Sequence, residues 1–141
     1  MTTYTTTTPH TDPLAAAVAA MHQLAATDWA TMKHTLEAEE RPGPVPSTSV
    51  LEYAYAGAFL SELGYVGNHE STRLWKIDTT ELQAAHRFVL GINERHRAEL
   101  ATVEVGSQEQ GERTTMMRVR SRALIDLARV IRARVDSKRR W

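Results

Sequence analysis

The feature that most constrains the fold is an apolar stripe in the last quarter of the chain, where hydrophobic side chains recur at steps of three and four residues. Counted at about 100° per residue, these side chains fall on one side of a helix: Met117, Leu124, Leu127, Ala128, Ile131 and Val135. The spacing predicts an amphipathic helix from about Thr114 to Arg140. Because such a helix has to cover its stripe with other elements, the pattern indicates a mainly α fold.

A second helical pattern near the start of the chain has a clear beginning and end. Asp12 is a good N-cap, and Pro13 fits the first helical position because proline lacks the N–H that would be unsatisfied there. The apolar periodicity then runs to about Glu40. It cannot continue through residues 41–47, which contain three prolines and a glycine.

The middle of the chain begins two more helices. Ser49 followed by Glu52 has the pattern of a capping box, and Gly64 suits the left-handed residue at a helix end. Apolar side chains between them surround nearly the whole circumference, which is typical of a helix that is buried or shared with a partner. A further capping box at Asp78 and Glu81 predicts another helix.

Residues 65–77 differ from the helical segments. A polar turn at residues 67–70 lies between two short runs of strand-forming residues, so the segment predicts a β-hairpin. We therefore expect a mainly α fold with four to five helices and one short hairpin. Trp75 in the predicted second strand and Trp29 on the first helical stripe are both expected in the core.

The expected organisation has four parts. They are a disordered threonine-rich tail over residues 1–12, a helical core over 13–100 with the hairpin at about 65–77, a connection over 101–112, and an arginine-rich amphipathic helix over 113–141.

The composition excludes several classes of protein. The chain has no cysteine, which rules out disulfides, thiolate metal sites and cysteine nucleophiles. No apolar run approaches the roughly 20 residues that a membrane span needs, so we expect a cytoplasmic protein that does not enter a membrane. Net charge is zero, but residues 1–70 carry −6 and the remainder carries +6. Such asymmetry is typical of a polyanion-binding end, or of two halves that face each other.

Enzyme motifs are missing from the sequence. It contains no glycine-rich phosphate loop and no nucleophile elbow, and none of the six histidines stands four residues from another. We therefore expect no catalytic residues, no metal site and no cofactor.

One arrangement points to nucleic acid. A helix that ends at residues 60–66 and leads through a polar turn into residues 73–77 resembles the end of a winged helix-turn-helix domain, over about residues 14–78. The resemblance implies that the helix beginning at Ser49 reads the major groove and that the later helices form a dimer. It also implies phosphate contacts from Ser47, Thr48, Ser49, Arg73 and Lys76. The same residues also fit a buried helix followed by a structural hairpin.

The C-terminal helix carries a basic flank beside its apolar stripe. Its members are Arg118, Arg122, Arg129 and Arg132, followed by Lys138 and Arg139. Arginine matches phosphate through its planar fork, so the flank predicts contacts to a nucleic-acid backbone. An acidic protein surface, including the acidic first half of this chain, is the alternative partner.

The leading hypothesis is a small DNA-binding regulator of winged-helix type that uses the wing and the arginine-rich helix for phosphate contacts. The alternative is a non-enzymatic helical assembly or adaptor protein, acting as a structural subunit of a larger protein or nucleoprotein particle. We expect association into a homo-oligomer in either case, because two helices carry more apolar surface than a chain of this length readily covers.

Overall fold

The computed structural model describes residues 12–38 and 45–139, the last two without their side chains. Within that part the prediction of a mainly α fold with four to five helices is confirmed. The elements in chain order are α1 (Pro13–Ala38), α2 (Thr48–Glu62), α3 (His69–Arg73), the 3-10 turn η2 (Leu74–Lys76), α4 (Thr79–Leu100) and α5 (Gln108–Arg139). The predicted tail lies outside the described residues except for Asp12. Helix α5 begins at Gln108, six residues before its expected start.

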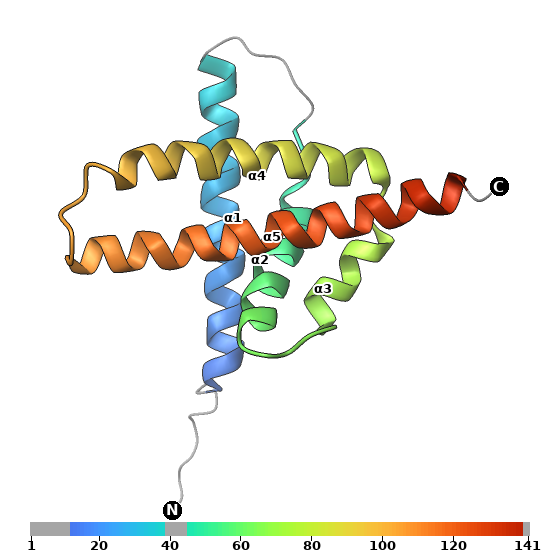
Figure 1. Cartoon of the computed structure of the whole chain (residues 1–141), viewed down its shortest axis with the longest axis horizontal. Helices are drawn as coiled ribbons and strands as arrows, with labels where there is room; N and C mark the ends of the chain where they lie inside the picture. The colour runs from blue at the N-terminus through green and yellow to red at the C-terminus, as the bar shows by residue number, and fades with distance from the viewer. Residues whose placement is uncertain (1–11, 39–44, 140–141) are drawn as a thin grey trace, which may run out of the picture.

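The helices form two crossed layers with α2 at the centre. Helices α4 and α5 run antiparallel, and the pair lies across α1 and α2 (Figure 1). Helix α2 contacts α1, α3, α4 and α5. Its buried side chains occupy most of its circumference, as its composition predicts: Val50, Leu51, Ala54, Tyr55, Ala56, Ala58 and Leu60. An all-round apolar helix is stable here because other helices cover it.

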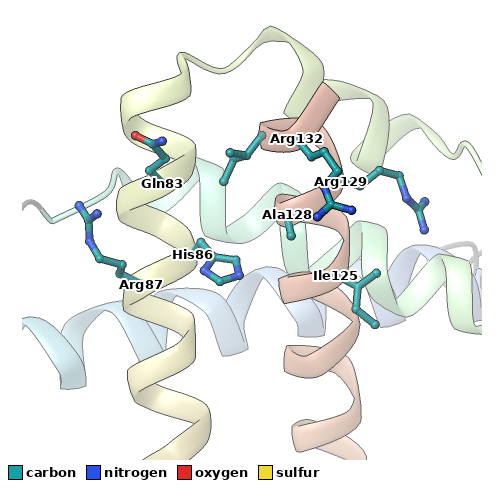
Figure 2. A pocket seen from close by; sticks show the side chains of 8 residues that line it. Gln83, His86, Arg87, Ile125, Ala128, Arg129 and Arg132 are labelled. Atoms are coloured by element: carbon teal, nitrogen blue, oxygen red, sulfur yellow. The ribbon is translucent and has the colours of Figure 1, made fainter. Parts of the chain in front are cut away.

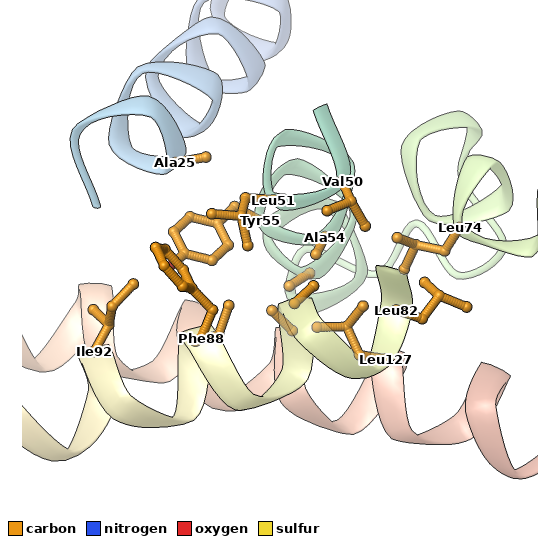
Figure 3. Packing of buried hydrophobic residues seen from close by; sticks show 14 of the residues in the cluster. Ala25, Val50, Leu51, Ala54, Tyr55, Leu74, Leu82, Phe88, Ile92 and Leu127 are labelled. Atoms are coloured by element: carbon orange, nitrogen blue, oxygen red, sulfur yellow. The ribbon is translucent and has the colours of Figure 1, made fainter. Parts of the chain in front are cut away.

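The core lies where the two layers meet. Leu51 and Tyr55 of α2 point toward Phe88 of α4, and Leu127 of α5 lies in the same cluster (Figure 3). Each of these large side chains contributes on the order of 1.5–3 kcal/mol by leaving water. Ala25 brings α1 to the cluster, and its small side chain is completely buried.

Local signals account for several helix ends. The backbone N–H of Leu14 donates to Asp12 Oδ1 at 3.0 Å, and that of Thr80 donates to Asp78 Oδ2 at 3.1 Å, so both aspartate caps are confirmed. Gly64 follows α2 with φ of +100°, in the left-handed region that glycine tolerates.

The predicted capping box at Ser49 is wrong. Helix α2 begins at Thr48, and the side chain of its N-cap, Ser47, makes no capping bond. The Ser47 N–H donates instead to Glu81 Oε1 on α4 at 2.9 Å. The acceptor at the start of α2 is therefore a residue of another helix, and not Glu52 as the capping box predicts. Because Glu81 binds Ser47, its carboxylate does not complete the capping box predicted with Asp78.

The predicted β-hairpin over residues 65–77 is also wrong, because this segment forms a turn followed by α3 and η2 and contains no strand. Asn68 explains the difference. Its Oδ1 accepts from the Ser71 N–H at 2.9 Å and caps α3, while its Nδ2 donates to the carbonyls of Gly57 at 3.1 Å and Tyr65 at 2.9 Å. An isolated hairpin is marginal in water, whereas a capped helical turn packed on α2 is held by these bonds.

The two tryptophan predictions have different outcomes. Trp29 is partly buried against the core, and its Nε1 donates to the Pro46 carbonyl at 2.7 Å. Trp75 is 50% exposed, because the helical turn directs its side chain away from the core that a strand would have faced. None of the helices among residues 12–38 and 45–139 has the length and apolarity that a membrane span needs.

Candidate functional site

The arginines of α5 are used in three different ways, and the first is inside the core. Arg120 is 1% exposed, and its guanidinium donates to both carboxylate oxygens of Asp28 on α1, at 2.7 and 3.1 Å. The Tyr55 hydroxyl of α2 donates to Asp28 Oδ2 at 2.7 Å. One buried cluster thereby joins α1, α2 and α5.

The charges of this cluster are fixed by its surroundings. Burial alone would lower the pKa of Arg120, but hydrogen bonding to Asp28 and its negative charge raise that pKa above the usual value. Burial, reinforced by Asp28, raises the pKa of Tyr55 well above its ordinary value. The cluster is therefore a neutral phenol beside a closed ion pair, and Arg120 has a structural role.

Arg134 also works inside the fold. Its guanidinium donates to the carbonyl of Trp75 at 2.6 Å, to the carbonyl of Ile77 and to Thr79 Oγ1 at 3.2 Å. These acceptors lie at the junction of η2 and α4, so Arg134 holds that junction against α5.

A second set of arginines pairs with carboxylates away from the Asp28 cluster. Arg113 lies 3.1 Å from Glu99 and 2.9 Å from Glu109. Arg122, a predicted phosphate ligand, lies 3.3 Å from Asp126 and 3.7 Å from Glu62. The basic helix is thus neutralised in part by acidic residues of its own chain.

The remaining arginines of α5 with described side chains face solvent, as does Arg87 of α4. Within the described residues no carboxylate lies within 4.0 Å of Arg87, Arg118 or Arg132, and Arg129, with a side chain 60% exposed, reaches Asp126 only at 3.9 Å. We call these four arginines the basic face. Ile125 lies on the same side of α5 and is 54% exposed.

A groove opens between α4 and α5 at the basic face. This α4–α5 groove has a volume of about 800 Å³, within the range of ligand-binding clefts, and is shown in Figure 2. It is lined by Gln83, His86, Arg87, Ile125, Ala128, Arg129, Ile131 and Arg132. None of these lining residues, all of them described, is acidic. The groove therefore combines an apolar floor with a cationic rim.

His86 is the titratable group of the groove. Burial lowers its pKa below the ordinary value of 6.5, so the ring is neutral at pH 7 and offers one donor and one acceptor nitrogen. Its side chain points into the space between the two helices (Figure 2). The arginines at the rim account for the positive charge of the groove at neutral pH.

The other residues predicted to contact phosphate are distributed over several elements. Ser47, Thr48 and Ser49 begin α2, where the carboxylate of Glu81 already accepts the Ser47 N–H. Arg73 of α3 lies over the Tyr53 ring at 5.1 Å and contacts His69 Nε2 at 2.7 Å. Lys76 of η2 is exposed. The side chains of Lys138 and Arg139 lie outside the described part of the chain.

The apolar stripe of α5 agrees with its predicted position only in part. Leu127 is buried and Leu124 and Ile131 pack against the core as expected, but Ala128 and Val135 are exposed. The side that faces the core instead carries Val119, Arg120, Ala123, Asp126 and Val130. Sequence reasoning missed Arg120 and Arg134 as internal residues, although each stands seven positions from Leu127 and therefore on nearly the same side of the helix.

Within the described residues no group of three or more histidine, aspartate or glutamate side chains is placed to hold a metal ion. Comparison of the chain with protein-family models, with curated proteins and with solved structures found no match. Its function has to be inferred from its own side chains.

Proposed function

We propose that this protein is a non-enzymatic helical adaptor that binds an acidic segment of another protein in the α4–α5 groove. The observation that carries the proposal is the position of Arg129 and Arg132 of α5, which with Arg87 of α4 line an apolar groove whose lining has no acidic residue. A cationic rim of this kind attracts an acidic partner and orients it on approach.

The apolar part of the site favours a protein over a nucleic acid. Ile125 is 54% exposed in the middle of the basic face, and Ala128 and Ile131 line the groove beside it. A phosphate backbone gives such side chains nothing to pack against, whereas the apolar residues of an amphipathic helix do. Arginine beside a partly covered aliphatic residue is also a common composition of protein interfaces.

Nucleic acid is the second candidate, and the spacing of the basic face supports it. Arg118 and Arg132 are separated by 14 residues, or roughly 21 Å along the helix axis, which is long enough to follow several phosphates. Less supports the winged-helix hypothesis, in which α2 would bind in the major groove of DNA. Helix α2 is largely buried, and Glu81 brings a negative charge to the N-terminus where phosphate would bind.

The test uses a synthetic acidic helix as the probe. We choose a peptide of about 14 residues, with leucines on one face and glutamates on the other, so that its helix is about as long as the basic face. Fluorescence anisotropy then measures its dissociation constant at low and at physiological salt. Arg129→Glu with Arg132→Glu is expected to weaken binding about tenfold or more, since each pair is worth about 0.2–1 kcal/mol and reversed charges repel.

A matched control separates the groove from general electrostatics. Arg95→Glu makes the same kind of charge reversal on an exposed residue of α4 that does not line the groove. It should change binding by less than about threefold. Equal losses from Arg95 and from the groove arginines would contradict the proposal. Preferential binding of random duplex DNA, with a steep salt dependence, would favour nucleic acid instead.

A further inference from the structure

Four large apolar side chains are exposed where the chain leaves α2 and enters α3 and η2. Leu63, Tyr65 and Val66 belong to the turn after α2, and they are 54%, 52% and 78% exposed. Trp75 of η2 is 50% exposed and lines the same surface recess as Val66. We call these four residues the η2 patch. The other exposed large apolar side chains of the described residues are distributed over α4, α5 and two connections, so exposed apolar surface is concentrated here.

The turn that carries most of the η2 patch is held in one shape. Gly64 and Gly67 have φ of +100° and +71°, so the chain reverses at two residues that tolerate the left-handed region. The Asn68 side chain then donates to the carbonyls of Gly57 on α2 and of Tyr65 in the turn, at 3.1 and 2.9 Å. Because the turn is already ordered, a partner that covers the patch pays little of the entropy that ordering a loop would cost.

The size of the patch fits a weak protein–protein contact. A fully exposed aromatic side chain presents about 150–250 Å², so the four residues present on the order of 400 Å² at their observed exposure. The largest apolar patch of a typical monomer covers about 300–600 Å² and is often an interaction site. Two copies that met through the patch and its charged neighbours would bury about 800–1,200 Å² in total, which is the range of transient complexes.

The charges beside the patch suit a second copy of the same chain. Glu62 directly precedes Leu63, Lys76 directly follows Trp75, and both charged residues are exposed. Within the described residues no carboxylate lies within 4.0 Å of Lys76, and the cation nearest Glu62 is Arg122 at 3.7 Å. A two-fold contact brings the same surface of both copies together, so an acidic and a basic neighbour of the patch can pair twice. The chain has no net charge, so two copies approach without long-range repulsion.

We propose that two copies of this protein associate through the η2 patch, about a two-fold axis, into a weak homodimer. The apolar side chains of the two patches cover one another. Glu62 of each copy pairs with Lys76 of the other copy, and these two pairs fix the orientation of the contact. None of the four patch residues lines the α4–α5 groove, so the dimer contact and the proposed binding of an acidic partner use different residues.

The first experiment tests the apolar part of the contact. Analytical ultracentrifugation of the full-length protein between about 1 μM and 1 mM should show a reversible monomer–dimer equilibrium, as expected for an interface of this size. Val66→Glu and Trp75→Glu each place a charge inside the contact, and each should weaken dimerisation at least about tenfold. Val105→Glu is the matched control. Val105 is 86% exposed, in the connection at the opposite end of α4 from η2 (Figure 1), and its substitution should leave dimerisation unchanged.

The second experiment exchanges the charges. Glu62→Lys and Lys76→Glu each place like charges opposite one another twice, so each should weaken dimerisation about tenfold. The double variant Glu62→Lys/Lys76→Glu has opposite charges at both positions again and should dimerise as the unchanged protein does. Glu104→Lys makes the same change of net charge in the connection between α4 and α5, and it should alter the dissociation constant by less than about threefold. Circular dichroism verifies that each variant is folded.

Three results would overturn the inference. The first is a protein that remains monomeric up to about 1 mM, well above the dissociation constant of a transient dimer. The second is an equal effect of Val66→Glu and Val105→Glu, and the third is a charge-exchanged double variant that dimerises no better than the two single variants. None of these results depends on whether an acidic peptide binds in the α4–α5 groove, because peptide binding is measured separately and on other residues.

Discussion

Replacing Asp28 by asparagine leaves Arg120 charged and without its partner in the core. Asp28 is 4% exposed and Arg120 is 1% exposed, so solvent screens their interaction little. Breaking a buried pair by removing one charge costs about 3–5 kcal/mol, which is a large share of the 5–15 kcal/mol by which domains are stable. We therefore expect Asp28→Asn to lower the free energy of unfolding by about that amount.

A double-mutant cycle separates the ion pair from the space that it fills. Arg120→Met removes the cation and keeps a long side chain, so the Asp28→Asn/Arg120→Met variant has no unpaired charge. Because apolar replacements of buried pairs are often neutral, this variant should be more stable than the Asp28→Asn single variant. Tyr55→Phe removes only the phenolic donor and leaves the bidentate pair, so its expected cost is smaller, about 1.5–3 kcal/mol.

Urea denaturation followed by circular dichroism measures each free energy of unfolding, and the slope with urea must stay constant for the comparison to hold. Arg118→Met is the matched control, an exposed arginine of the same helix, and should change stability by no more than about 0.5 kcal/mol. Two results would refute the reasoning. One is a cost below about 1 kcal/mol for Asp28→Asn, and the other is strict additivity of the two single substitutions.

Two further predictions concern pH and packing. Burial lowers the pKa of His86 in the folded protein below the value of 6.5 that it has in the unfolded chain. Between these two pKa values the unfolded chain binds more protons than the folded one, so the free energy of unfolding should decrease as the pH falls through this range. His86→Gln should make the fall shallower in urea titrations between about pH 7 and pH 5; an unchanged pH dependence would be contrary evidence. Gly57→Ala would place Cβ 2.5 Å from Ser71 Oγ and 2.8 Å from its backbone nitrogen, so α3 must shift. We expect a loss of about 1–3 kcal/mol in thermal unfolding, whereas Gly111→Ala, with open space around it, should be neutral or stabilising; equal effects would be inconsistent with this packing.

Local chemistry made much of the helical framework predictable. The caps at Asp12 and Asp78 and the left-handed Gly64 depend on neighbouring residues, so the sequence alone locates those helix ends. The burial of α2 was also predictable, because no other environment suits a helix that is apolar on nearly every side.

Contacts between distant segments determine the structure of residues 65–77 and the start of α2, which local sequence patterns did not predict. Residues 65–77 have the alternation of a hairpin, but the amide of Asn68 bonds to the Gly57 carbonyl on α2 and also caps α3. The N–H of Ser47 similarly finds its acceptor on Glu81, 34 residues away. Periodicity within a segment cannot reveal partners that the chain supplies from elsewhere.

The candidate site depends on which arginines of α5 face the core and which face solvent, and a count of charges does not show this. Arg120 and Arg134 each stand seven residues from the buried Leu127, and this heptad row is the one that α5 directs into the fold. Arg118 and Arg132 form a different heptad row with the exposed Ile125 between them. The arginines of α5 therefore fall into two groups that the composition of the helix does not distinguish: those of one row hold the helices together, and those of the other are exposed to solvent. Substitutions that test binding have to spare the first row, because changes there would remove the surface along with the fold.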